Sequence, residues 1–161
     1  MLRFLKEVTF SNESRVDFTS EEPIQKGFIK VFLQGTLAAE GRDGRLLMRI
    51  NDLEDSYVSF VHMGGAAGMG EWGDASGLYL GRTGWGLDAT FSAEVTLAVN
   101  TESQQVITGS GASVFALGDN RILGYENHGH LVTQDPIKTI SFLTTEGNMS
   151  GFGSYYVYQP S

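Results

Sequence analysis

Apolar and polar residues alternate along most of this chain with a period of two. In residues 27–39, Ile29, Val31 and Leu33 point one way with Lys30 and Gln34 opposite, and residues 45–51 and 57–63 repeat the pattern. Gly and Asp residues separate these runs. Alternation interrupted by turn-forming residues is typical of antiparallel β-strands. We therefore expect residues 27–63 to form three antiparallel strands around which the rest of the chain is organised.

The alternation is strict again in residues 87–99, and no segment of ten or more residues has the spacing of a helix. The chain has 161 residues, with 21 glycines against 3 prolines, which suits one domain with many tight turns. These features predict an all-β fold, a single-domain antiparallel β-sandwich or jelly roll. The further strands are expected at residues 87–99, 106–115, 122–131, 137–145 and 152–158.

The first 26 residues differ from the rest of the chain, because short apolar anchors are spaced by polar residues. Two interpretations stay open: a pair of edge strands, or an extended arm that packs on a neighbouring subunit. The domain proper would then span residues 27–161. In the arm interpretation, residues 1–20 are needed for attachment rather than for folding. The partner contacts would be Phe4, Leu5, Val8 and Phe10.

Residues 64–86 hold nine glycines and both tryptophans. Such a density of glycine predicts a long, largely irregular surface loop, with a short strand at residues 78–81. Trp72, Tyr79 and Trp85 are the candidate binding aromatics of this loop. If exposed, they could stack on a sugar or seat a protein partner, and if buried they would close one end of the sandwich.

The formal net charge of −8 argues against nucleic acid and anionic membranes as partners. The absence of cysteine excludes disulfides, thiol catalysis and thiolate-bound zinc. The N-terminal residues lack the continuous apolar core of a signal peptide, and no apolar run approaches the roughly 20 residues that span a bilayer. We expect synthesis in a cytoplasm and no membrane partner.

Candidate catalytic or cofactor motifs are few. Gly68, Gly70 and Gly73 match a dinucleotide-binding glycine pattern, but the residues after them do not predict the helix that binds pyrophosphate. His128 and His130 could share one face of a strand as metal ligands, with Asp135 folding back, but a histidine pair near a strand end is the simpler interpretation. We expect no enzymatic activity, no cofactor and no metal.

Three segments together resemble jelly-roll virion structural proteins of tailed bacteriophages. In the first, an apolar strand ends in Arg49-Ile50-Asn51 and Tyr57 opens the next strand. In the second, a long strand closes in Val99-Asn100-Thr101. The third, residues 137–160, is similar to their closing hairpin, with a Gly-Asn turn and a Tyr-rich last strand. One departure is Asp52, which stands where the resemblance leads us to expect glycine.

The resemblance implies a homotrimer that serves on the virion by binding. Two roles follow from it: a capsid decoration (cement) protein that binds the major capsid protein and stabilises the head, or a tail-fibre domain that recognises a host cell-surface glycan. We favour capsid decoration, because the chain is short and self-contained. Phe28 and Phe32 interrupt an otherwise polar strand face and are the expected trimer contacts.

Overall fold

The computed structural model describes residues 2–65 and 68–160, and these form strands, turns and short loops without a helix. The strands follow the alternating runs closely, in most cases to within two residues at either end. In chain order they are β1 (Arg3–Glu13), β2 (Arg15–Ile24), β3 (Lys26–Ala38), β4 (Arg45–Ile50), β5 (Tyr57–Gly65), β6 (Gly68–Asp74), β7 (Leu78–Arg82), β8 (Ala89–Asn100), β9 (Val106–Leu117), β10 (Ile122–Val132), β11 (Ile137–Thr144) and β12 (Asn148–Tyr158).

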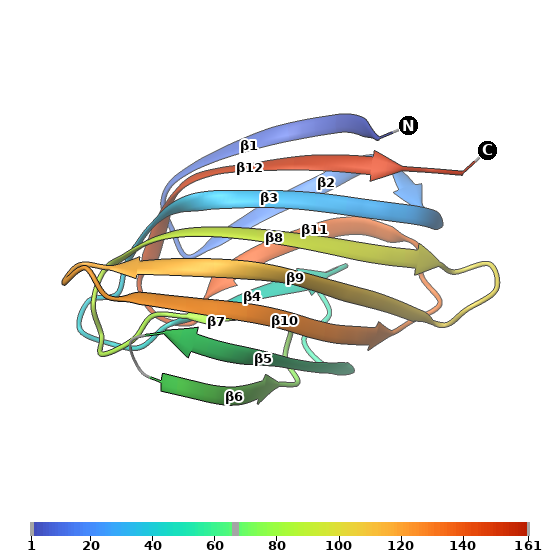
Figure 1. The fold of residues 1–161 in the computed structure, drawn as a ribbon. Helices are drawn as coiled ribbons and strands as arrows, with labels where there is room; N and C mark the ends of the chain where they lie inside the picture. Colours follow the sequence, from blue (N-terminus) through green and yellow to red (C-terminus); the bar gives the residue numbers. More distant parts are fainter. Residues whose placement is uncertain (1, 66–67, 161) are drawn as a thin grey trace.

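The strands form two packed antiparallel sheets. The large sheet has eight strands in the order β1-β12-β3-β8-β9-β10-β5-β6, and the small sheet has four in the order β2-β11-β4-β7. Figure 1 looks onto the outer face of the large sheet, with the small sheet behind it. The prediction of an all-β antiparallel sandwich is confirmed.

The strand order is jelly-roll-like. The first strand lies beside the last, followed by β3 and β8, while β2, β11, β4 and β7 form the facing sheet in the matching order. The strands β9, β10, β5 and β6 widen the large sheet beyond this arrangement (Figure 1). The chain therefore crosses repeatedly from one sheet to the other.

These crossings correct two expectations about pairing. Within residues 27–63, β3 and β5 belong to the large sheet and β4 to the small one, so consecutive strands are not neighbours. The C-terminal segment is not a hairpin either, because β11 and β12 lie in opposite sheets. Alternation tells which side chains are buried, and either sheet can bury them, so the pattern leaves the pairing partners undetermined.

The core lies between the sheets and is filled by the inward-facing half of each strand. Ile29, Val31 and Leu33 of β3 are all buried there. Phe18 of the small sheet stacks on Tyr155 of the large sheet with ring centroids 4.0 Å apart. The large aromatic side chains thus join the two layers, as the hydrophobic effect requires of two half-apolar sheets.

Residues 2–24 pack against the rest of the same chain. β1 pairs with β12 at one edge of the large sheet, and β2 pairs with β11 at the corresponding edge of the small sheet. Phe10, Val16 and Phe18 are buried in the common core. These contacts anchor the segment to both layers of the sandwich.

The prediction of a long irregular loop at residues 64–86 is wrong for the described part of this stretch, which excludes residues 66 and 67. β6 pairs with β5 along its length, and β7 contains the short strand expected at residues 78–81. Several glycines make room for aromatic rings. A Cβ on Gly70 would lie 2.7 Å from the ring of Trp72, and one on Gly81 would lie 2.6 Å from the ring of Phe115.

Asn51 and Tyr57, two of the residues that carry the sequence resemblance, make hydrogen bonds that fix the connection between β4 and β5. The Asn51 side chain accepts hydrogen bonds from the amides of Lys138 and Thr139 and donates one to the Pro136 carbonyl. Both Asn51 and Asp52 have positive φ, 53° and 58°. Asp52 therefore adopts the left-handed conformation for which glycine was expected, which aspartate tolerates better than most residues.

Candidate functional site

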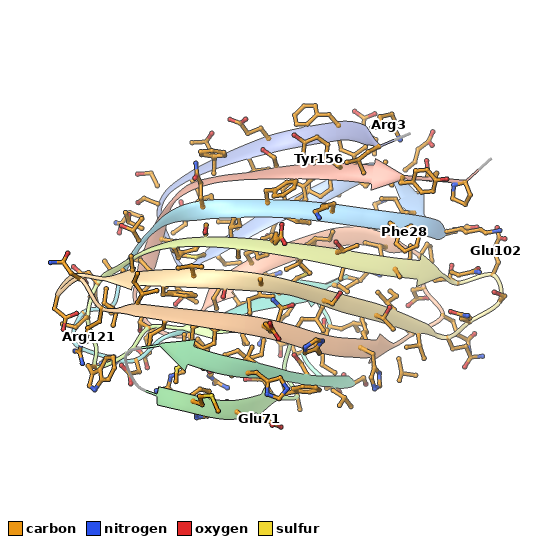
Figure 2. The ribbon with its side chains drawn as sticks, viewed as in Figure 1. Arg3, Phe28, Glu71, Glu102, Arg121 and Tyr156 are labelled. Atoms are coloured by element: carbon orange, nitrogen blue, oxygen red, sulfur yellow. The ribbon has the colours of Figure 1, made fainter. Side chains whose placement is uncertain are left out.

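Large apolar side chains are exposed on the outer face of the large sheet, on the strands near the two chain termini. Figure 2 shows Phe28 and Tyr156 on neighbouring strands there. Exposed aromatics on one sheet face are unusual, because this face normally carries polar residues when it meets only water. We define the aromatic cluster as Phe4 of β1, Tyr156 and Tyr158 of β12, and Phe28 and Phe32 of β3.

The rings of the aromatic cluster support one another. Tyr156 meets Phe4 at 5.5 Å and Phe32 at 5.9 Å, both edge to face, and Phe28 meets Tyr158 at 6.3 Å. Phe4, Phe28 and Phe32 nonetheless stay 53%, 47% and 42% exposed. Edge-to-face contacts orient aromatic rings at little cost. The cluster is therefore an ordered apolar surface that no other part of the described chain covers.

One basic group lies beside the cluster. The ammonium of Lys30 is 5.5 Å from the Phe32 ring centroid and 4.0 Å from a carboxylate oxygen of Glu94. Cation–π contact and the ion pair both hold the lysine against the sheet. This pair marks the boundary between the aromatic cluster and the middle of the sheet.

Two shallow depressions cross the middle of the same face, and we call them together the central groove. The first has a volume of about 470 Å³ and lies between Phe32, Phe152 and Val114, over Ser92 and Ala112. The second has a volume of about 480 Å³ and lies over the ends of the same three strands. Its exposed lining includes Thr36 of β3, Thr90 of β8, Ala116 of β9 and Asn120.

The groove lies where Thr90 and Ser92 of β8 and Ala112 and Ala116 of β9 present small side chains outward. Ser92 lies directly opposite Gln34 on one side and Val114 on the other. Thr90 lies directly opposite Thr36 and Ala116 in the next outward row. The two depressions therefore adjoin along the strand direction, since side chains two residues apart share a face.

Histidine and acidic side chains gather on β5, β6 and β10, on the side of the large sheet away from the aromatic cluster. His62 lies 3.6 Å from a carboxylate oxygen of Glu71, and its ring centroid is 6.1 Å from that of His128. Phe60 contacts both imidazoles, with centroids 5.3 Å away in each case. Within the described residues, no three His, Asp or Glu side chains are placed to hold a metal ion. His130, next along β10, has a buried Nδ1 for which the described chain offers no partner.

The four arm residues named from the sequence separate in the structure. Phe4 joins the aromatic cluster, and Phe10 is only 6% exposed. Leu5 and Val8 are partly buried against the core. Phe10 is thus a core residue, and its assignment to a partner contact is wrong, because β1 turns this side chain between the sheets.

Trp72, Tyr79 and Trp85 do not form a common surface. Tyr79 is 1% exposed, which excludes it as a partner or glycan contact and agrees with the buried alternative. Trp72 is half-buried against the core, with the Arg82 guanidinium 5.5 Å from its ring. Trp85 is 49% exposed, and its ring centroid is 3.6 Å from the guanidinium of Arg121. Arg121 lies at the end of the molecule away from Arg3 (Figure 2).

The glycine pattern at residues 68–73 lies on β6 and is followed by the small-sheet strand β7, so the described structure gives it no helix N-terminus for pyrophosphate. In the described residues, no helix is long and apolar enough to cross a membrane. The aromatic cluster and the central groove are therefore the features that stand out as candidate binding surfaces.

Sequence reasoning singled out Phe28, Phe32 and Phe4 but missed Tyr156, Tyr158 and the whole groove. The available signal for the tyrosines was the Tyr-rich last strand. For the groove it was the small side chains of Thr90, Ser92, Ala112 and Ala116 among the outward positions of β8 and β9.

Comparisons with known proteins add little to this description. No protein family matches the sequence, and no curated protein matches it. Among solved structures, a homodimeric agglutinin from chicken liver aligns at 8% identity over 86% of this chain and 98% of its own, with a TM-score of 0.30. A galectin of Caenorhabditis elegans aligns at 10% identity over 86% and 95%, with a TM-score of 0.28. A GFP-like protein from the marine copepod Chiridius poppei aligns at 9% identity over 95% and 88%, with a TM-score of 0.25. At these values the likeness carries no argument, and the fold description rests on the strand pairing.

Proposed function

We propose that this protein is a virion structural protein of a tailed bacteriophage, a homotrimer of jelly-roll subunits that binds the major capsid protein and stabilises the head. Its task is binding and not catalysis. The assignment to a bacteriophage virion rests on the sequence resemblance at Arg49, Asn51 and Tyr57. The mode of action rests on the shape and chemistry of the large sheet.

The exposed aromatic cluster is the observation that carries the proposal. Five aromatic rings from three neighbouring strands lie together in water, which opposes the hydrophobic effect unless another surface covers them. Phenylalanine and tyrosine held in fixed orientations lose little entropy when a partner packs on them. We assign Phe28 and Phe32 to the contact between subunits of the trimer.

A trimer multiplies weak contacts with the capsid. Once one subunit is bound, the other two meet their sites at high effective concentration, so three modest contacts act as one strong attachment. The acidic surface that results from the net charge of −8 keeps unbound protein soluble before assembly.

A receptor-binding domain of a tail fibre is the second candidate. The observation that favours it is the central groove, which offers a concave surface to a small ligand. The aromatics Trp72, Tyr79 and Trp85 do not serve this candidate, because they are dispersed and Tyr79 is buried.

Copy number distinguishes the two roles. Quantitative mass spectrometry of purified virions, with the major capsid protein as internal reference, should give hundreds of copies per particle for a decoration protein. A handful of copies would overturn the capsid role and favour the tail. Absence from purified virions would overturn both.

A binding assay then tests the surface. Phe28→Ser combined with Phe32→Ser should abolish trimer formation and weaken binding to capsids that lack the protein. The matched control is Val58→Ser with Val132→Ser, which removes two exposed valines, 58% and 52% exposed, from other strands of the large sheet. Equal effects of the two double variants would contradict a specific role for the cluster.

A further inference from the structure

We propose that the central groove binds an uncharged oligosaccharide that lies along β3, β8 and β9. This goes beyond the capsid role, because it gives each subunit a ligand site of its own. It does not depend on where the protein sits on the particle. The inference stands on the shape of the groove, on the side chains that line it, and on its charge.

The shape fits an extended ligand. The two depressions adjoin along the same three strands, with Gln34, Ser92 and Val114 in one row and Thr36, Thr90 and Ala116 in the next. Successive outward rows repeat every two residues, about 7 Å, along a strand. A groove of several such rows matches a chain of a few sugar rings better than it matches a compact cofactor.

The groove lies in the middle of the sheet, which determines what can recognise the ligand. β3 pairs with β12 and β8, β8 with β3 and β9, and β9 with β8 and β10. The backbone amides and carbonyls of these strands are therefore used within the sheet, and a peptide cannot bind there by adding a strand. Recognition must come from side chains.

Those side chains have the chemistry that sugars require. Gln34, Ser92 and Thr90 offer hydroxyl and amide groups that both donate and accept hydrogen bonds, as sugar hydroxyls do. Phe152, which is 37% exposed, stands at one side of the groove and offers apolar ring surface to the C–H face of a sugar. The groove thus combines a polar floor with an aromatic wall.

The charge of the lining selects the class of sugar. Glu94 and Asp88 are the charged residues among those that line the two depressions, and both are acidic. The carboxylate of Asp88 accepts a hydrogen bond from the Ala39 amide, and that of Glu94 lies 4.0 Å from the Lys30 ammonium, which is not part of the groove lining. A sialylated, phosphorylated or uronate-containing chain would meet like charge, so an uncharged glycan is favoured.

The test is to titrate the full chain with three oligosaccharides and to monitor its amide signals by two-dimensional ¹H–¹⁵N NMR. Cellohexaose and chitohexaose are uncharged, and oligogalacturonate is the anionic comparison. We expect at least one uncharged probe to shift the amides around Ser92, Thr90 and Ala116 with saturable, millimolar or tighter affinity. Oligogalacturonate should leave these signals unchanged.

A matched pair of variants locates the site. Ser92→Arg fills the groove with a long side chain and should abolish the shifts. Ser110→Arg makes the same change at another exposed serine, on the same face, outside the groove lining, and should leave the titration intact. A dispersed spectrum like that of the unmodified protein shows that each variant is folded.

Three outcomes would overturn the inference: no saturable shift with either uncharged probe, equal shifts with the anionic probe, or equal loss in both variants. None of these depends on the virion. Copy number tests the capsid role separately, so a failure of one proposal is distinguishable from a failure of the other.

Discussion

The ring of Phe32 stands edge-to-face on the ring of Tyr156, with centroids 5.9 Å apart and planes at 84°. The two residues lie on neighbouring strands, β3 and β12, and Tyr156 makes a similar contact with Phe4 on its other side. Segments from the start, the first third and the end of the chain thus build one exposed apolar surface. We regard that surface as the principal binding element of the protein.

The first prediction concerns two buried tyrosine hydroxyls with opposite roles. The Tyr57 hydroxyl accepts a hydrogen bond from the Ile50 amide at 2.8 Å and donates one to the Leu53 carbonyl at 3.0 Å. Tyr57→Phe leaves these groups unpaired and should lower the free energy of unfolding by about 1–3 kcal/mol. Urea unfolding followed by circular dichroism measures the change.

Tyr155→Phe is the matched control. In the unmodified protein, the Tyr155 hydroxyl is buried and has no partner within the described chain. Burial raises the pKa of this phenol well above its usual value. Removing the hydroxyl should stabilise the protein by about 1 kcal/mol or leave it unchanged. Equal losses in the two variants would show that hydroxyl pairing is not what distinguishes them.

The second prediction concerns the connection between the sheets. Asn51→Ala removes all three side-chain hydrogen bonds to the segment that begins β11 and places alanine at a positive φ. We expect a loss of about 2–4 kcal/mol, the sum of these terms. Asn51→Asp keeps the accepting oxygen and should lose less. The order of the two melting temperatures is the measurement, and a reversed order would contradict this account of the connection.

The third prediction is a pH dependence at Asp17. Burial raises the pKa of this carboxyl, but hydrogen bonds from Ser141 and Arg15 outweigh it, and the folded-state pKa is lowered from 3.8. A depressed pKa stabilises the folded state above the unfolded pKa, and the contribution is lost as the pH falls through the folded value. Stability should therefore decline between about pH 5 and pH 2.

Asp17→Asn should make this acid decline shallower, because the asparagine does not titrate. Asp135→Asn, the same change of charge at another exposed aspartate, is the matched control. Urea midpoints measured across the pH range provide the comparison. An unchanged slope in Asp17→Asn would exclude this carboxyl as a source of the acid sensitivity.

The fourth prediction replaces the expectation that residues 1–20 are dispensable for folding. Deleting them removes Phe10, Val16 and Phe18 from the core and opens the edges of β12 and β11. Three buried side chains contribute about 1.5–3 kcal/mol each, against about 5–15 kcal/mol for a whole domain. The truncated chain should show no cooperative melt. Phe4→Ala, at an exposed residue, should melt almost as the unmodified protein does, and a cooperative melt of the truncation would contradict this role of the segment.

Much of the secondary structure could be predicted, because period-two alternation directly reflects one buried face. The run at residues 106–115 became β9 and the run at residues 122–131 became β10 with small changes at the ends. Pairing could not be predicted, since β3 finds its neighbours 50 and more residues away along the chain. The glycine-rich strand β6 was missed because its glycines accommodate the ring of Trp72 and weaken the alternating pattern.

The candidate site was only partly predictable for the same reason. Phe28 and Phe32 stood out as apolar residues at polar positions, which is a local signal. Their contacts with Tyr156 and Tyr158 depend on the register between β3 and β12, which the local pattern does not contain. The sequence left open whether Tyr79 is exposed or buried, because burial of an aromatic side chain depends on which sheet its strand joins.

Light scattering of the purified protein, compared with the Phe28→Ser, Phe32→Ser double variant, tests the central claim most directly. We predict a mass of three times 17.5 kDa for the unmodified protein at micromolar concentration, and 17.5 kDa for a double variant that still melts cooperatively. The valine control should remain trimeric. An unmodified protein that stays monomeric as its concentration rises, or a double variant that stays trimeric, would contradict the account.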